Sequence, residues 1–353
     1  MQLSDDKILQ YDIEQIAEAD FIPWQQLKNS SILITGATGL IGSQVVMALL
    51  HANEAKHLGL TVYAAVRNEA KAEKIFAKAS GDALKLVVQD IMQPFDMMEH
   101  IDYIIHGASM TGSRDFVDYP VETIKTAISG TENVLELAKK NNIKGMVYLS
   151  SLEVYGVVDF SIASVSEDMN GTLDSMSVRS SYSEGKRMVE CMCASYAAEY
   201  NLPIKVARLC QTFGPGVSYG DNRVFAQFAR SIIEGNDIVL KTDGSTERNY
   251  CYTKDAITGI LTVLLSGNAG EAYNVANKDT LITIRGMAEM LIGLYPKSGT
   301  SLVFDIAEDV TKLGYNPKVK MNLDTAKLES LGWTATVPLK DMFKNLIDSM
   351  IIA

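Results

Sequence analysis

The feature that most constrains the fold is a short apolar β run that leads through a glycine-rich loop into an apolar helix. Residues 31–35 read Ser-Ile-Leu-Ile-Thr, glycines stand at positions 36, 39 and 42, and the helical pattern runs from Gly39 to Leu50. Glycines at this spacing between a strand and a helix are typical of the first unit of a doubly wound α/β sheet. The sequence therefore predicts a parallel sheet that begins with this strand.

The pattern that follows alternates between apolar, β-branched runs and longer helical segments. We expect strands at 61–66, 84–88, 101–105, 146–149 and 204–209, and helices at 121–140 and 181–200. Strands that alternate with helices of this length form right-handed βαβ units, and helices then cover both faces of the sheet. The predicted fold class is α/β, a doubly wound parallel Rossmann sheet.

The glycine loop is suited to bind a dinucleotide. Glycines let the backbone approach a pyrophosphate closely, and the helix that follows offers free N–H groups and the positive end of its dipole. We therefore expect NAD or NADP as cofactor, with a tight structural turn as the alternative explanation of the loop. The expected contacts are Gly36, Thr38, Gly39, Leu40, Ile41 and Gly42.

The ends of the next strands supply further candidate cofactor contacts. Val66 stands where an acid often binds the ribose diol, and Arg67 follows it, where an arginine can accommodate a ribose 2′-phosphate. Arg67 therefore indicates NADP or use of both cofactors, and a solvated surface arginine is the alternative. Asp90 and Ile91 end the third strand, where a carboxylate can accept a bond from the adenine amino group, and Ala108 follows the fourth.

The alternation fades after Phe213, where helices and short strands mix with several glycines and prolines. We expect an N-terminal helical extension (1–28), an NAD(P)-binding Rossmann domain (29–210) and a smaller α+β substrate lobe (211–353) interleaved with it. The extension is expected to be helical from Lys7 to Lys28 and to cap the fold, with Trp24 and Leu27 docked on the main body.

Charge and composition exclude several classes of partner. The net charge of −11 argues against a nucleic acid or an anionic membrane, because both repel an acidic surface. No stretch reaches the ~18 apolar residues that span a bilayer, and the acidic start does not resemble a secretory signal, so we expect a cytoplasmic protein. We expect no metal site, and buried, reduced thiols at Cys191, Cys193, Cys210 and Cys251, which contain no C-x-x-C pair.

A candidate catalytic set combines one helix with one strand end. Tyr182 and Lys186 are four residues apart and share a helix face, so the ammonium is expected to lower the tyrosine pKa toward neutrality. Tyr182 would then act as general base or acid on a hydroxyl that becomes a carbonyl, and Lys186 would also hold the nicotinamide ribose. Ser151 ends the fifth strand, where its hydroxyl can bind the substrate oxygen.

These motifs resemble those of the extended short-chain dehydrogenase/reductases, specifically the nucleotide-sugar epimerase/dehydratase/decarboxylase group. The resemblance implies oxidation of the sugar at C4 by hydride transfer, a second step on the ketone, and the usual roles for Ser151, Tyr182 and Lys186. The matching segments are Thr35 to Gly42, Asp90-Ile91, 105–108, 150–156, 182–187, 207–208, 213–215 and 331–333.

The identity of the second step depends on the two residues after Ser151. Relatives that are dehydratases or decarboxylases carry a glutamate at the position of Glu153, where it could remove the proton next to the ketone. A glutamate bonded to loop backbone is the alternative. Leu152 departs from the resemblance, because dehydratases have an aspartate there and decarboxylases a small hydroxyl residue. We expect a lyase (4,6-dehydratase or decarboxylase), with a 4-epimerase or an NADPH-dependent carbonyl reductase as alternatives and a non-catalytic cofactor sensor after them.

The diphosphate of a nucleotide sugar requires cationic partners. Arg248 matches the family's phosphate-binding arginine, and Arg223 is a second candidate, although either could be a surface arginine. Gln211 stands where many relatives have an asparagine that contacts the diphosphate. Relatives dimerise through the helices that correspond to 121–140 and 181–200, so we expect a homodimer.

Overall fold

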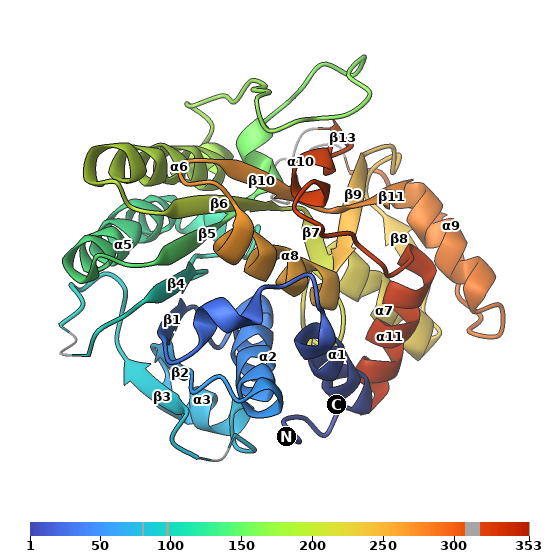
Figure 1. Ribbon diagram of the computed structural model, residues 1–353. Helices are drawn as coiled ribbons and strands as arrows, with labels where there is room; N and C mark the ends of the chain where they lie inside the picture. The colour runs from blue at the N-terminus through green and yellow to red at the C-terminus, as the bar shows by residue number, and fades with distance from the viewer. Residues whose placement is uncertain (80, 97–98, 308–317, 353) are drawn as a thin grey trace.

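A computed structural model describes residues 1–79, 81–96, 99–307 and 318–352. Within these residues, seven parallel strands form the main sheet in the order β10-β6-β5-β4-β1-β2-β3 (Figure 1). The expected Rossmann sheet is therefore confirmed. Its strands are β1 (Ser31–Thr35), β2 (Thr61–Val66), β3 (Leu84–Val88), β4 (Tyr103–His106), β5 (Gly145–Ser151), β6 (Ile204–Leu209) and β10 (Ala272–Val275).

Both faces of the sheet are covered by helices, because successive strand side chains point to opposite sides. In β1, Ile32 and Ile34 lie in one apolar core with residues of α2 and α8. Leu33 lies in a second core with residues of α5 and α6 on the opposite face. The four helices are α2 (Leu40–Lys56), α8 (Thr253–Ser266), α5 (Pro120–Asn141) and α6 (Ser181–Tyr200).

Two short helices that the sequence did not predict lie between the strands, α3 (Glu69–Ile75) and α4 (Asp115–Asp118). The fourth strand was expected from Ile101, but β4 begins at Tyr103. The amide of Ile101 donates a hydrogen bond of 2.9 Å to the side chain of Asn141, at the end of α5. Ile101 therefore lies in the connection that leads into β4, not in the strand itself.

The C-terminal region forms a smaller lobe with its own sheet and helices (Figure 1). Phe213, Tyr250 and Phe343 are fully buried in its core. Between these segments the chain returns to the main sheet, where β10 pairs with β6. The lobe contains β7 (Gln211–Phe213), β8 (Ile238–Leu240), β9 (Glu247–Tyr252), β11 (Asn277–Thr283), β12 (Leu302–Phe304), β13 (Lys320–Met321), α7 (Val224–Glu234), α9 (Ile284–Leu294) and α11 (Leu339–Ile352). The short helix α10 (Ala326–Glu329) packs instead on β10 of the main sheet, and its Leu328 belongs to the main apolar core.

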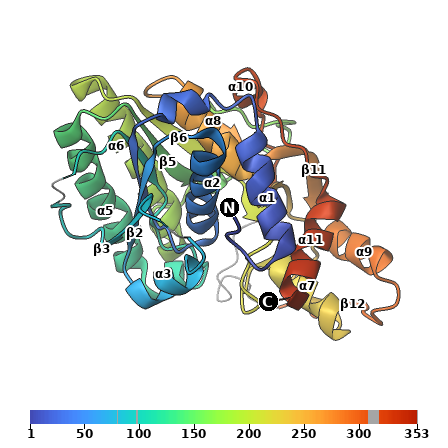
Figure 2. The ribbon, with the colours of Figure 1, turned by 60° about the horizontal axis from the view of Figure 1, so that its bottom comes forward.

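The N-terminal helix α1 (Lys7–Glu18) lies between α2 of the main body and α11 of the smaller lobe (Figure 2). Asp6 caps α1, and its carboxylate also accepts a hydrogen bond from Ser349 of α11. The helix ends at Glu18, well before the expected Lys28, because Ala19 is extended and Pro23 cannot continue a helix. Within the expected range, a separate 3-10 helix η1 (Trp24–Leu27) follows Pro23. The docking expected for Trp24 and Leu27 is confirmed, since both are buried.

Two expectations about composition can be compared with the described residues. No helix among them combines the length and the apolar character needed to cross a bilayer. All four cysteines are free thiols, but only Cys193, Cys210 and Cys251 are buried. The expectation of a buried thiol is wrong for Cys191, which lies on the exposed side of α6, two residues from the buried Cys193.

Candidate active site

The glycine loop is packed so closely that side chains are excluded at two of its positions. Gly36 has a φ of 70°, and a Cβ there would lie 2.9 Å from the amide nitrogen of Ala108. A Cβ on Gly42 would lie 2.2 Å from the carbonyl oxygen of Gly36. Since α2 begins at Leu40, its first amides have no acceptor within the helix. The loop therefore has the shape and the free donors that a pyrophosphate requires.

The ends of β1 and β4 are joined beneath this loop by a buried histidine. His106 Nδ1 lies 2.6 Å from Thr35 Oγ1, and His106 Nε2 lies 3.0 Å from Thr131 Oγ1. The hydroxyl of Thr35 also accepts a bond of 3.2 Å from the amide of Ala108. Burial, assisted by the charge of Lys186, lowers the pKa of His106 to about 3. His106 is therefore neutral and holds the two strand ends together.

The candidate adenosine contacts lie at the ends of β2 and β3. Arg67 is exposed, and so is Asp90, whose carboxylate caps a turn by accepting from the amide of Met92 at 2.9 Å. Ile91 is buried, and its carbonyl accepts a bond of 2.8 Å from the Asn133 side chain. Ile91 thus fastens β3 to α5, while the two charged side chains face solvent at the sheet edge.

Lys186 is held deep in the site by one carbonyl and one aromatic ring. Its side chain is 3% exposed, its Nζ donates to the carbonyl of Leu149 at 2.8 Å, and it lies 4.6 Å from the Tyr148 ring centroid. Burial lowers the pKa of Lys186 to about 8, although the nearby carboxylate of Glu190 raises it. The Tyr182 ring centroid is 5.7 Å from the same nitrogen.

The structure brings Ser151, Tyr182 and Lys186 together, but the expected effect on the tyrosine is wrong. The pKa of Tyr182 is raised well above its usual value, chiefly by burial and secondly by the charge of Glu153. A hydrogen bond with Ser151 opposes this rise. The ammonium of Lys186 lies beside the ring and donates to the backbone of β5, so spacing on the helix alone does not make a phenolate.

Glu153 lies in the 3-10 helix η2 (Leu152–Tyr155) that follows Ser151. Its carboxylate forms a bidentate ion pair with Arg179, with both N–O distances 3.1 Å, and accepts from Ser183 Oγ at 3.1 Å. Its amide donates to Ser151 Oγ at 3.2 Å. The carboxylate is thus oriented by side chains of η3 (Val178–Ser180) and α6. These contacts differ from the alternative considered above, in which the glutamate bonds to loop backbone.

Two residues that the sequence analysis did not assign complete this cluster. The Arg179 guanidinium lies 4.8 Å from the Phe116 ring centroid, and Phe116 stacks on Tyr182 with centroids 4.2 Å apart and planes 11° apart. Arg179 stands three residues before Tyr182, and this spacing is the only sequence clue to its place in the cluster. Phe116 carried no signal, because α4 is too short to show a period. Leu152 is only 4% exposed and belongs to the main apolar core.

The substrate candidates lie on the lobe side. Within the part of the chain that the structure describes, the buried Nε of Arg248 and the hydroxyl of Tyr250, two residues apart on β9, have no hydrogen-bond partner. Gln211 pairs with Tyr250 in the β7–β9 register. Arg223, just before α7, forms an ion pair of 2.6 Å with Asp221. Its positive charge also lowers the pKa of Tyr182. A buried N–H without an acceptor is costly, so Arg248 is suited to an anionic ligand.

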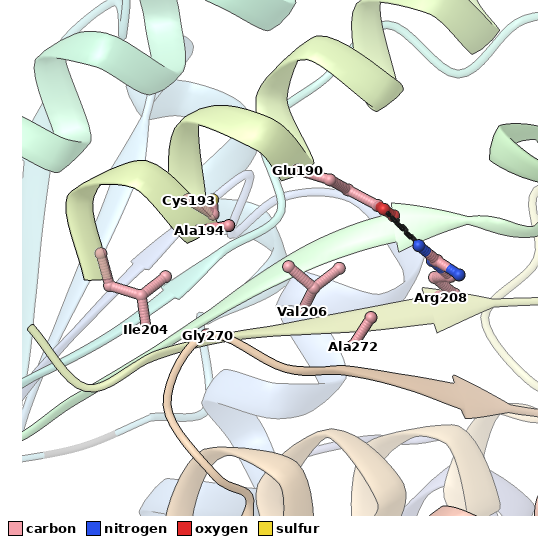
Figure 3. Close-up of a pocket in the computed structure, with 8 residues that line it drawn as sticks. All are labelled: Glu190, Cys193, Ala194, Ile204, Val206, Arg208, Gly270 and Ala272. Atoms are coloured by element: carbon pink, nitrogen blue, oxygen red, sulfur yellow. Dashed lines mark hydrogen bonds and ion pairs between the residues drawn. The ribbon is translucent and has the colours of Figure 1, made fainter. Parts of the chain in front are cut away.

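A separate hollow of about 140 Å³ lies at the edge of the sheet between α6, β6 and β10 (Figure 3). Glu190 and Arg208 form an ion pair of 2.7 Å across its wall. Glu190 also accepts from Ser150 Oγ at 2.5 Å. Glu190 lies one helical turn after Lys186 on α6 and ties α6 to β5 and β6. The hollow therefore lies behind Lys186 and is separate from the candidate active site.

The comparisons with known proteins can now be set against this geometry. A family profile described as the NAD dependent epimerase/dehydratase family matches residues 32–276. UDP-glucuronic acid decarboxylase 5 of Arabidopsis thaliana is 30% identical over 315 residues, which cover 83% of this chain and 86% of the relative.

Solved structures agree on the fold. The UDP-glucose 4-epimerase of Thermotoga maritima, with UDP-glucose, is 22% identical with a TM-score of 0.77 over 91% of this chain and 99% of its own. The dTDP-glucose 4,6-dehydratase of Streptomyces venezuelae, with NAD bound, is 24% identical with a TM-score of 0.76 over 91% and 97%. With the glycine loop and the Ser151–Tyr182–Lys186 set in place, the chain belongs to the NAD-dependent epimerase/dehydratase family of nucleotide-sugar enzymes.

Proposed function

We propose that this enzyme oxidises a nucleotide sugar at C4 and then cleaves a bond of the 4-keto sugar, acting as a lyase, and that the cleavage is a decarboxylation. The observation that carries the proposal is the carboxylate of Glu153, held beside Ser151 and Tyr182. Among the relatives, the Arabidopsis protein named above is a UDP-glucuronic acid decarboxylase. The proposed substrate is accordingly a nucleotide-linked hexuronic acid.

The cofactor would be held by the glycine loop, by Arg67 and Asp90 at the sheet edge, by Ile91 and Ala108, and by Tyr182 and Lys186. NAD supplies a hydride acceptor and a positively charged ring. We propose that Arg67 lets the enzyme accept NADP as well as NAD, because its exposed guanidinium could pair with a 2′-phosphate.

In the first step Tyr182 would take the proton of the C4 hydroxyl while the hydride leaves C4. Ser151, within hydrogen-bonding reach of the phenol, would hold the same oxygen. The raised pKa of Tyr182 means that added positive charge in the site must assist this step.

Decarboxylation of the resulting β-keto acid breaks the bond between C5 and the carboxyl carbon. The electron pair moves to the C4 oxygen, which Ser151 and Tyr182 would stabilise, and the carboxylate of Glu153 would relay to C5 the proton that Tyr182 took in the first step. This sequence needs no acid to expel a hydroxyl group. A 4,6-dehydration does need one, and Leu152, buried in the core at the relevant position, has no proton to give. The burial of Leu152 therefore favours decarboxylation over dehydration.

The nucleotide diphosphate would be bound by Arg248, whose buried Nε has no partner among the described residues, and by Gln211, which lies opposite Tyr250 on the neighbouring strand. Arg223 is the second candidate cation, on the side of the site that faces Tyr182. Bidentate contacts from arginine to phosphate would fix the nucleotide and leave the sugar to reach Ser151.

The test is a panel of UDP-glucuronic acid, UDP-glucose, dTDP-glucose and GDP-mannose with NAD or NADP, read by mass spectrometry and proton NMR. Loss of carbon dioxide from UDP-glucuronic acid, abolished by Tyr182→Phe, is the expected result. Loss of water, or an isomer of unchanged mass, would replace the proposal by a dehydratase or a 4-epimerase. Gain of two hydrogens with stoichiometric NADPH consumption would select the carbonyl reductase, which the exposed Arg67 favours.

We also propose a homodimer formed by α5 and α6 with their counterparts in a second copy. The two helices pack closely on each other, since a Cβ on Gly185 would lie 3.3 Å from that of Ala127. Their outer sides nevertheless expose Ile124 at 40% and Met188 at 51%. Exposed apolar side chains on adjacent helices are a common mark of a protein–protein interface.

A further inference from the structure

A layered contact joins Arg179 to the catalytic tyrosine. The Phe116 ring stacks on Tyr182 at 4.2 Å on one side, and its centroid is 4.8 Å from the Arg179 guanidinium. The backbone carbonyl of Phe116 is fixed by a 2.9 Å bond from Ser181 Oγ on the same helix as Tyr182. A cation beside an aromatic ring is attracted to it, so Arg179 and Phe116 stabilise each other's position.

The charges around Tyr182 come from several elements that pack against it. Glu153 of η2 raises the pKa of the phenol, whereas Ser151 of β5, Arg179 of η3 and Arg223 before α7 lower it. The bidentate pair of Glu153 and Arg179 has side chains only 11% and 14% exposed, so solvent screens it weakly. The negative charge that opposes the phenolate is therefore balanced at its source.

This arrangement resolves a conflict in the proposed reaction. The first step needs a phenolate at Tyr182, and the second needs a carboxylate at Glu153, but two neighbouring anions disfavour each other. We propose that Arg179 is a positioning residue that orients Glu153 for the second step and cancels its charge at Tyr182 during the first. The inference rests on the proposed function and assigns Phe116 as the spacer that keeps the guanidinium at this distance.

The consequence is that the two steps respond differently to substitution. Arg179→Met removes the guanidinium charge that pairs with Glu153, so the first step should slow about tenfold at neutral pH and its acidic limb should move up by about one pH unit. Adding Glu153→Gln to Arg179→Met removes the opposing charge and should return the first step to within about threefold of wild type. The double variant should still lose the second step by about 100-fold or more.

The experiment is single-turnover kinetics with UDP-glucuronic acid and NAD between pH 6 and 9, following reduced nicotinamide for the first step and carbon dioxide for the second. Arg179→Lys keeps the charge without the bidentate geometry and should restore the pH profile but only part of the second step. Arg285→Met is the matched control, because Arg285 also pairs with a carboxylate, Glu289, and lies 5.6 Å from an aromatic ring, Phe304. Thermal unfolding of each variant checks that it is folded.

Two failures can be separated. If the wild-type enzyme releases no carbon dioxide from UDP-glucuronic acid, the proposed function is overturned and this inference with it. If the wild type is active but Arg179→Met keeps the wild-type pH profile, only the role of Arg179 is overturned. The same follows if the double variant is no faster in the first step than Arg179→Met, because a merely structural ion pair predicts no rescue.

Discussion

The N-terminal helix carries a buried carboxyl group that makes a quantitative prediction possible. Asp12 is 3% exposed, one of its carboxylate oxygens has no hydrogen-bond partner, and the other side of the group faces the phenol of Tyr252. Burial raises the pKa of Asp12 from 3.8 to about 6, the charges of Asp255 and Asp6 add to the rise, and Lys254 opposes it. The substitution Asp12→Asn removes this titration with little change in volume.

The sign follows from the linkage between proton binding and folding. Because the folded protein binds the Asp12 proton more tightly than the unfolded chain, the group contributes stability below about pH 4, and this contribution is lost as the pH rises through about 6. The difference between 3.8 and about 6, at about 1.4 kcal/mol for each pH unit, corresponds to about 3 kcal/mol. At pH 4 the unfolded carboxyl is already partly ionised, so relative to Asp12→Asn the wild type should lose about 2 kcal/mol of unfolding free energy between pH 4 and pH 7.

The assay is urea unfolding of the two proteins at half-unit steps from pH 4 to pH 8, with Asp5→Asn as control. Asp5 belongs to the same extension, but its side chain is 90% exposed. Parallel stability curves for wild type and Asp12→Asn would refute the reasoning, and so would a wild type that becomes more stable relative to Asp12→Asn as the pH rises. The same effect in Asp5→Asn would show that the slope belongs to the extension as a whole.

Three further outcomes are expected. Gly42→Ala should weaken NAD binding more than tenfold by calorimetry, because its Cβ would meet a loop carbonyl at 2.2 Å, whereas Gly293→Ala has no atom within 4 Å and should bind normally; equal affinities would contradict this. The pair Ile124→Glu with Met188→Glu should sediment as a monomer at micromolar concentration, and a monomeric wild type would remove the dimer. Tyr250→Phe should raise the unfolding free energy by about 1 kcal/mol, since it removes a buried hydroxyl without a partner; a less stable variant would be inconsistent with that account.

The strands of the main sheet could be located from the sequence because both of its faces are buried. The strand 61–66 then reads as an apolar, β-branched run, and its bounds agree with β2. The bounds of 204–209 agree with β6, although Lys205 and Arg208 interrupt its apolar residues. The four-residue strand β10 could not be found in this way. It reads Ala-Tyr-Asn-Val, and only its pairing with β6, more than sixty residues earlier in the chain, makes it a strand.

The same distinction applies to the site: some of its features come from residues close in sequence, and others from contacts between distant segments. Gly36, Ser151, Tyr182 and Lys186 belong to motifs that are local in sequence, and the structure brings the last three together. The pKa of Tyr182 could not be predicted, because it depends on burial and on a carboxylate from another element. The partner of that carboxylate lies 26 residues further along, across an irregular segment with no periodic signal.

The residues that follow Ser151 show why the reaction is decided by packing as much as by chemistry. In η2 the side chain of Leu152 enters the apolar core, while that of Glu153 meets Arg179 and Ser183. A proton donor is thereby absent from the one position, and a fixed carboxylate is present at the other. A β-keto acid loses carbon dioxide without a donor for a leaving hydroxyl, whereas dehydration requires that donor. The pair therefore supports the proposed decarboxylation, and under that proposal Arg179 would be the residue on which the timing of the two anions depends.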